Sequence, residues 1–367
     1  MPKVALIFLL TSVLYAAPKP ASPADPTTII LEAFRTHPIV ALSEGQHWNE
    51  QGHAFRMSLI RDPRLSAVVN DIVVECGDAR YQEVIDRFIA GSDVPYDKLR
   101  HVWEDTTITN TVWDMPIYEE FYRTVREINR ALPPNKRFRV LLGDPPIDWT
   151  KISGKDEVLK WMNQRNAFAA ELVRKEVLAK HRSALLIYGD GHLFRKGEET
   201  VPAWYIDKTK PEEPLVSQLE RTNPGAVFSI GAPTGSDLTK FQPDVANWHA
   251  PSIALLPRTT LGAAPFAVVY DLTGPEFQSV SMENQFDAIL YLGPPSTITL
   301  AELSKAKCSD KQYMKMRLGR MALVPWGQYE INSLNSFCGL KTVTISFLDH
   351  LGAGTARKAH QALSHFS

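Results

Sequence analysis

The sequence has few cysteines, no excess of charge of either sign and few long apolar runs. Three cysteines among 367 residues allow one disulfide at most and leave one thiol over. The 40 basic and 41 acidic residues nearly cancel, so no overall field favours nucleic acid as a partner. After the N-terminal run, no apolar stretch approaches the ~18 residues of a membrane span. The absence of a Gly-x-Ser-x-Gly elbow and of a phosphate-binding glycine loop disfavours a serine α/β-hydrolase and a nucleotide-binding loop.

The N-terminal residues are typical of an export signal. Lys3 supplies the positive charge, residues 4–14 form an apolar core too short to span a bilayer, and Ala16 and Ala17 are small residues suited to cleavage. We expect cleavage after Ala16 and a soluble mature protein, periplasmic or secreted. Residues 17–26 are rich in proline and are predicted to form a flexible leader.

Four apolar segments each end in an acidic residue or a histidine. One such residue usually caps a helix or forms a turn, but if the strands are parallel, their carboxyl ends meet in one crevice. The sequence therefore predicts a shared polar site there. Its members are Glu44 and His47 after residues 39–43, Glu75 after 71–74, Asp144 after 138–142, and Asp190 and His192 after 184–188.

Helical patterns alternate with these strands. Helices are expected over residues 27–37, 50–60, 81–89, 115–132, 155–180, 214–219 and 314–321, and further strands over 226–230, 266–270 and 288–292. Residues 231–260 are rich in loop-forming residues. The alternation predicts an α/β domain of residues 27–295, with a mainly parallel sheet flanked by helices and the site at the carboxyl edge of the strands. Residues 296–367 form a C-terminal extension.

Residues 92–114 interrupt this alternation with a stretch rich in Trp, Thr and Asn that has no clear period. We predict that they form a lid or specificity insertion over the crevice. The substrate, a small molecule or a peptide, is expected to contact several residues of this region and of the strand ends. The predicted substrate-binding residues are His53, Arg80, Trp103, Trp113, Asp144 and Asp190.

The stretch Ser43-Glu44-Gly45-Gln46-His47 resembles the Gly-Glu-x-x-His motif of the erythromycin esterase family. Arg56, nine positions after His47, and Glu75, twenty-eight after it, fall where that family has an arginine and a second glutamate. The stretch 189–192 resembles the Gly-x-x-His of the wider Tiki and ChaN-like haem-uptake superfamily. The resemblance covers about residues 39–195 and implies a related α/β fold and crevice.

The sequence also departs from the esterase pattern at three positions. Ser43 replaces a glycine, Gln51 stands where an acid is expected, and Gly189 stands where the family has a histidine. One histidine of the catalytic region is therefore missing. The resemblance does not carry macrolide hydrolysis over to this chain.

The chemistry of these residues favours hydrolysis of an ester or amide. A water that attacks a carbonyl must lose a proton, and His47 is the natural base. Glu44 or Glu75 could orient the imidazole, and His192 could protonate the leaving group. Arg56 could stabilise an oxyanion, bind an acidic substrate group, or form a structural ion pair with Glu75.

Two other functions use the same residues. Glu44, His47, Glu75 and His192 could bind a divalent metal, as the Tiki resemblance suggests, although Glu-x-x-His in a loop lacks the helical spacing of a zincin. Haem or iron uptake is the non-enzymatic alternative, with His47 or His192 as axial ligand and a pocket of aromatic residues. That pocket would contain Trp103, Trp113 and Tyr118. A noncatalytic binder of a polysaccharide or peptide is a third possibility.

The cysteines allow one specific pairing. Cys308 and Cys338 lie in the same C-terminal region and are predicted to be bridged in exported material. Cys76 directly follows Glu75 and is expected to be a buried, unreactive thiol.

Overall fold

The computed structural model describes residues 17–195, 212–272, 277 and 279–340. The predicted export signal and the last 27 residues lie outside this range. No helix of the described part is long and apolar enough to cross a membrane.

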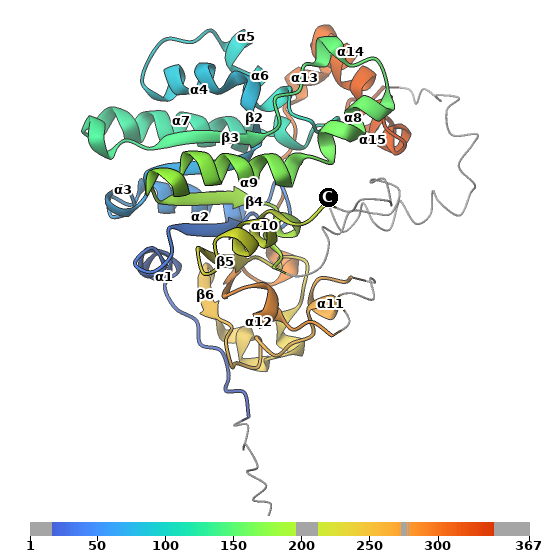
Figure 1. The fold of residues 1–367 in the computed structure, drawn as a ribbon. Helices are drawn as coiled ribbons and strands as arrows, with labels where there is room; N and C mark the ends of the chain where they lie inside the picture. Colours follow the sequence, from blue (N-terminus) through green and yellow to red (C-terminus); the bar gives the residue numbers. More distant parts are fainter. Residues whose placement is uncertain (1–16, 196–211, 273–276, 278, 341–367) are drawn as a thin grey trace, which may run out of the picture.

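A seven-stranded sheet in the order β3-β2-β4-β1-β5-β7-β6 forms the centre of the molecule (Figure 1). All neighbours are parallel except β6, which is antiparallel to β7. The predicted mainly parallel α/β fold is therefore confirmed. The strands are β1 Ile39–Ser43, β2 Asp71–Asp78, β3 Arg139–Asp144, β4 Ala184–Tyr188, β5 Val227–Gly231, β6 Ser252–Leu255 and β7 Ala288–Tyr291.

Helices cover both faces of the sheet, which explains why the strands are continuous apolar runs. Successive side chains of a strand point to opposite faces, so Val40 and Leu42 pack with α2, α4 and α7, whereas Ile39 and Ala41 pack with α9 and α10. The helices are α1 Pro26–Ala33, α2 Glu50–Arg61, α3 Leu65–Val68, α4 Gln82–Ile89, α5 Tyr96–Leu99, α6 His101–Glu104, α7 Pro116–Ala131, α8 Lys155–Met162, α9 Arg165–Glu176, α10 Leu215–Thr222, α11 Phe266–Val269, α12 Met282–Gln285, α13 Lys305–Ser309, α14 Lys311–Met321 and α15 Gly327–Phe337.

The start of α2 fixes the loop that follows β1. Asn49 is the N-cap residue of α2, and its side-chain oxygen accepts a hydrogen bond from the Gly52 amide at 2.6 Å. The side-chain nitrogen of Asn49 donates to the carbonyl oxygens of Glu44 and Gln46, each at 2.5 Å. One buried side chain thus ties the helix to the loop that carries Glu44.

Three elements differ from the predicted ones. The single helix expected over residues 155–180 is broken between α8 and α9 at the polar residues Asn163 and Gln164. The strand expected over 266–270 is wrong, because these residues form α11 after Pro265. The edge of the sheet is instead β6, which lies in the region predicted as loop and is only four residues long.

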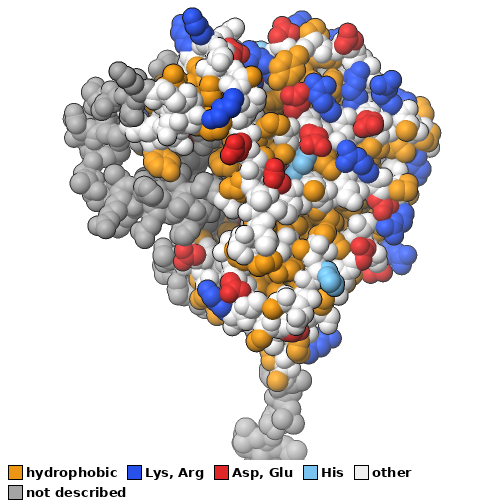
Figure 2. Space-filling view, turned by 180° about the vertical axis from the view of Figure 1, so that it is seen from behind, with side chains coloured by type: hydrophobic (Ala, Val, Ile, Leu, Met, Phe, Trp, Pro, Cys, Tyr) orange, Lys and Arg blue, Asp and Glu red, His pale blue; other side chains and the backbone are white. Residues whose placement is uncertain are grey.

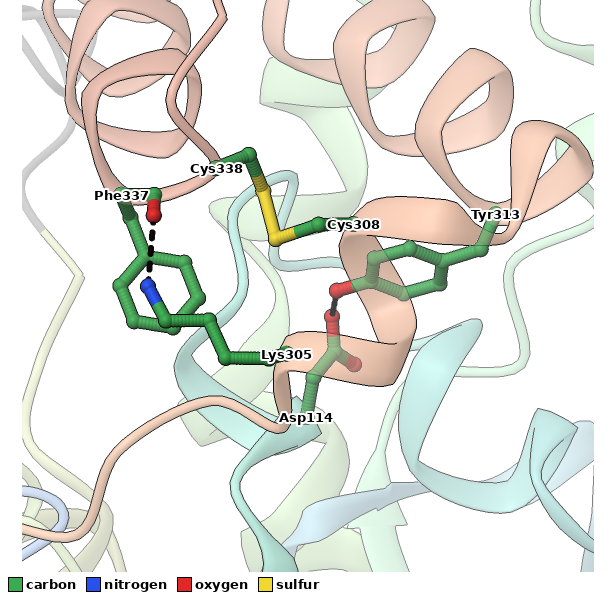
Figure 3. The surroundings of a disulfide bond; sticks show 6 residues. All are labelled: Asp114, Lys305, Cys308, Tyr313, Phe337 and Cys338. Carbon is green, nitrogen blue, oxygen red and sulfur yellow. Dashed lines mark hydrogen bonds between the residues drawn. A yellow bond between two sulfur atoms is a disulfide. The ribbon is translucent and has the colours of Figure 1, made fainter.

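The ends of the described chain pack against the domain. The leader lies along the sheet edge, in contrast to the predicted flexible segment: Ala24 pairs with Ile253, and the buried Ala21 donates its amide to the Gln242 side chain at 2.7 Å. At the other end, α13 to α15 lie beside α6 (Figure 1). The predicted disulfide is confirmed, with Cys308 and Cys338 Cα atoms 5.4 Å apart (Figure 3). Cys76 is free and buried, as expected.

The predicted insertion, residues 92–114, forms α5, α6 and the 3-10 turn η2 (Val112–Asp114). Its residues Trp103 and Trp113 are 2% and 1% exposed, so residues 102–109 and 112–114 pack in the core, whereas Tyr96 near its start is 48% exposed. On the face seen in Figure 2, acidic and basic side chains are interspersed among apolar ones, in keeping with the balanced composition.

Candidate active site

A carboxylate and an imidazole form a hydrogen-bonded pair directly after β1. Glu44 Oε2 lies 2.9 Å from His47 Nδ1. Because a carboxylate can only accept, Nδ1 carries the hydrogen and donates it. The tautomer is thereby fixed, and the lone pair of the neutral ring lies on Nε2. This is the arrangement in which an acid orients a histidine base.

Two further groups hold the carboxylate of Glu44, which is 3% exposed. Tyr118 donates its hydroxyl to Oε2 at 3.2 Å, and Arg56 Nη2 lies 3.8 Å from Oε1. Burial raises the pKa of Glu44, but the charge of Arg56 and the hydrogen bond from His47 outweigh it, so the pKa lies below its ordinary value. Glu44 is therefore ionised at neutral pH. The sequence allowed an ion pair between Arg56 and Glu75, but the partner of Arg56 is Glu44.

A second carboxylate–imidazole pair lies on the neighbouring strands. His192 Nε2 is 3.0 Å from Glu75 Oε1, and His192 Nδ1 is 2.5 Å from Asn166 Oδ1. The Gly189 amide donates to Glu75 Oε2 at 2.8 Å. Burial raises the pKa of Glu75, but the positive charges of His192 and Arg165 lower it well below its ordinary value. Both ring nitrogens of His192 are therefore engaged, one by the Glu75 carboxylate and one by the Asn166 side chain.

Arg165 joins the second pair to β3. Its guanidinium contacts Glu75 and also Asp144, the last residue of β3, with Nε 3.2 Å from Asp144 Oδ1. Thr107 donates its amide and its hydroxyl to the same carboxylate at 2.6 and 2.8 Å. Burial is the main cause that raises the pKa of Asp144 to about 6. One arginine thus neutralises two buried acids from adjacent strands.

The imidazole of His47 is held between two neighbours and is the part of the site that reaches solvent. Its side chain is 21% exposed, against 4% for Glu44 and Glu75 and 7% for His192. The Trp113 ring meets it edge-on, with centroids 4.9 Å apart. On another side lies Gly189, where an added Cβ would stand 3.0 Å from His47 Cε1 and 3.2 Å from Nε2. The histidine that the esterase pattern has at position 189 would therefore collide with His47.

The structure brings Glu44, His47, Arg56, Glu75, His192, Asp144 and Trp113 into this site, with Asp190 beside it, but the remaining predicted residues lie elsewhere. His53 is on α2 and pairs with Glu120 at 3.1 Å. Arg80 pairs with Asp148 at 2.9 Å in a separate cleft of about 300 Å³.

Trp103 is buried away from the imidazoles, whereas Asp190 is half-buried and close enough to His47 for the imidazole charge to act on its pKa. Trp103 stacks on Tyr122 in the core, with ring centroids 5.8 Å apart. Asp190 accepts from the Ala232 amide and the Tyr270 hydroxyl, each at 3.0 Å. Both residues therefore have structural contacts where the sequence predicted contact with substrate.

Sequence reasoning missed Arg165, Asn166 and Thr107. The first two lie where the predicted long helix is broken, three and four residues after Met162, and in a continuous helix they would share its apolar face. A signal was present, because residues 163–166 are all polar and leave a gap in the apolar stripe between Met162 and Ala169. Thr107 lies in the stretch without periodicity.

The predicted metal and haem candidates were tested against this geometry. Within the part of the chain that the structure describes, no group of three His, Cys, Asp or Glu side chains could hold a metal ion. The four candidate ligands are hydrogen-bonded to each other as Glu44–His47 and Glu75–His192. Since both ring nitrogens of His192 are engaged and its side chain is buried, it does not fit as an axial haem ligand. Metal and haem analysis of the purified protein checks this conclusion.

Comparison with known proteins gives likenesses of fold only. No family model matches the chain, and no curated protein matches its sequence. A Bacillus cereus protein of known structure shares 10% identity over 77% of this chain and 96% of its own, with a TM-score of 0.49. A succinoglycan biosynthesis protein shares 10% identity over 77% of this chain and 96% of its own, with a TM-score of 0.48.

An erythromycin esterase mutant in its open conformation shares 13% identity over 75% of this chain and 94% of its own, with a TM-score of 0.48. At these values the likenesses carry no argument about activity. The functional argument rests on the site itself.

Proposed function

We propose that this protein is a hydrolase that cleaves an ester or amide bond with a water molecule activated by His47. The observation that carries the proposal is the Glu44–His47 pair, in which a buried, ionised carboxylate orients the one solvent-reachable imidazole of the site. The same pair on other folds serves general-base catalysis.

In the proposed reaction His47 Nε2 takes a proton from water as the water oxygen bonds to the substrate carbonyl carbon. The tetrahedral intermediate then expels the alcohol or amine, which takes the proton back from the imidazolium, and the acid is left. Glu44 keeps the ring in its tautomer and stabilises its charged form. Arg56 lies behind Glu44, at 3% exposure, and so holds the carboxylate without contacting substrate.

His192 has a supporting role in this proposal. It is buried and engaged at both ring nitrogens, which does not suit a donor to a leaving group. Together with Arg165 it keeps Glu75 ionised, and Glu75 in turn accepts from the Gly189 amide beside His47. The second pair thus fixes the position of Gly189, which lies against the His47 ring.

Hydrolysis of p-nitrophenyl esters and of a macrocyclic lactone tests the proposal. His47→Gln should lower kcat by about 10²- to 10⁴-fold, because general-base catalysis contributes that much. Glu44→Gln should give a loss of similar size, because the amide no longer selects the tautomer. His53→Gln, on the next helix and paired with Glu120, is the matched control. Full activity in His47→Gln would refute the assignment.

Export is a separate proposal, since the signal lies outside the described residues. Sequencing the N-terminus of the mature protein tests it, with cleavage after Ala16 expected.

A further inference from the structure

The C-terminal helices bind a short segment of the domain through buried hydrogen bonds and ion pairs. We call residues 305–338 the C-terminal unit and residues 104–114 the wall segment. Asp114 at the end of the wall segment binds Arg317 of α14 through two contacts, 2.7 Å to Nε and 2.5 Å to Nη2. Tyr313 donates its hydroxyl to the same carboxylate at 2.5 Å (Figure 3). Arg317 is 0% exposed, so this is a fully buried, bidentate attachment.

Further contacts fasten the rest of the wall segment. Arg320 donates to the Glu104 carbonyl oxygen at 2.7 Å and binds Asp105 at 2.6 Å, and Lys307 binds the Glu104 carboxylate. From α15, Glu330 accepts hydrogen bonds from the side chains of Asn110 at 2.7 Å and Thr109 at 3.3 Å. Attachments thus occur along the whole wall segment.

Two contacts link the start of the C-terminal unit to its end. The Cys308–Cys338 disulfide joins α13 to the end of α15. Lys305 donates to the Phe337 carbonyl oxygen at 2.7 Å and lies over the Phe337 ring, 3.5 Å from its centroid (Figure 3). Because its two ends are linked, the C-terminal unit can hold the wall segment in a fixed position.

The wall segment reaches His47 most directly through Trp113, while Thr107 donates to Asp144 and the Val112 carbonyl oxygen accepts from Trp48 Nε1 at 2.6 Å. Trp113, next to Asp114, meets the His47 ring with centroids 4.9 Å apart, and it meets Tyr118, a hydrogen-bond donor to Glu44, at the same distance. Gly189 bounds the His47 ring at another side. Movement of the wall segment would therefore remove one of the two neighbours that confine the imidazole.

We propose that the C-terminal unit positions His47: by binding Asp114 and its neighbours it holds Trp113 against the imidazole. Trp113, Asp114 and Arg317 are positioning residues in this arrangement. The catalytic consequence rests on the proposed function, but the confinement of the imidazole does not. The unit is far from His47 in sequence, and its hydrogen bonds to the wall segment link it to the ring.

The rate at which diethylpyrocarbonate modifies His47 measures this confinement without any substrate. Mass spectrometry of the tryptic peptide 36–56 reports His47 together with His37 and His53, which serve as internal controls. In the double variant Asp114→Leu with Arg317→Met, apolar groups of similar shape replace the buried pair, an exchange that folds commonly tolerate. Modification of His47 should become about fivefold faster, as its side chain passes from 21% exposed to nearly free, whereas His37 is unchanged. Trp113→Ala should give the same change.

The matched control is Arg139→Met, which removes a partly buried ion pair at the opposite end of the sheet, where Asp71 keeps Arg182. It should leave the His47 rate unchanged. Reduction of the native protein with dithiothreitol, which converts the disulfide into two thiols and the reagent into its cyclic disulfide, should also raise the rate, and needs no substitution.

An unaltered His47 rate in the folded double variant and in reduced protein would overturn the proposal. An increase in the double variant but not in Trp113→Ala would refute the route through Trp113. Since turnover plays no part, these results stand apart from any failure of His47→Gln to lower activity.

Discussion

The buried Glu330 should make the attachment of α15 depend on pH. Its side chain is 7% exposed, and burial is the main cause that raises its pKa from 4.5 to about 7, against the hydrogen bonds from Asn110 and Thr109. In the folded protein this carboxyl keeps its proton up to about pH 7, whereas in the unfolded chain it loses it near 4.5. Between these values the native state binds more protons, so the free energy of unfolding falls as pH rises.

The size of the effect follows from the two pKa values. The full difference between 4.5 and about 7 corresponds to about 3 kcal/mol. Between about pH 5 and about pH 8 the loss is about 2 to 3 kcal/mol. Glu330→Gln keeps the shape and an acceptor oxygen but cannot ionise. The variant should therefore gain about 2 to 3 kcal/mol over the wild type from the lower pH to the higher.

Urea denaturation of both proteins at the two pH values measures this double difference. Glu127→Gln, an exposed position on α7, is the control and should show almost no pH-dependent difference. If Glu330→Gln changed the stability equally at both pH values, Glu330 would not titrate in this window. The argument that burial dominates its environment would then be refuted.

Three further outcomes are expected. Gly189→Ala should lower ester hydrolysis by about 10- to 100-fold while circular dichroism stays unchanged, because its Cβ would stand 3.0 Å from His47 Cε1 and a displaced base is costly; equal activity would contradict the close approach. Cys308→Ser with Cys338→Ser should lower the free energy of unfolding by about 3.5 kcal/mol, since the bridge closes a loop of 30 residues, and urea denaturation under non-reducing conditions measures it. Arg165→Met should lower the free energy of unfolding by about 3 to 5 kcal/mol, because Glu75 and Asp144 lose their shared cation. The loss should be larger at about pH 8 than at about pH 5, because both acids are ionised at the higher pH, and a loss independent of pH would contradict this explanation.

Much of the fold follows from the sequence because parallel strands buried on both faces are uninterrupted apolar runs. β1 and β4 match such runs closely, and the residues that follow them delivered Glu44, His47 and His192. β6 was missed because it is a four-residue edge strand, and edge strands carry little apolar signal. Glu75 lies inside β2 and not after it, because that strand continues through an irregularity to Asp78.

The sequence predicts the residues of the candidate site that lie close together in the chain, but not those that come from distant segments. Glu44, His47 and Arg56 lie close together in sequence, so spacing alone could relate them. Arg165 and Asn166 come from a helix break that helical periodicity smooths over, and their partners Glu75 and His192 are distant in the chain. The pairing of acids with cations is a property of the folded arrangement, and a sequence without its tertiary contacts does not contain it.

The place of β4 in the sheet has a consequence for how the two acid–imidazole pairs come together. β1 and β2 share no backbone ladder, and each pairs with β4 on one side. Glu44 and His47 directly follow β1 and Glu75 lies in β2, so the backbone ladder that aligns the two pairs is complete only when residues 184–188 lie between these strands. The last strand of this group to be synthesised closes the site, and its next residues, Gly189 to His192, supply the contacts that bind one pair to the other.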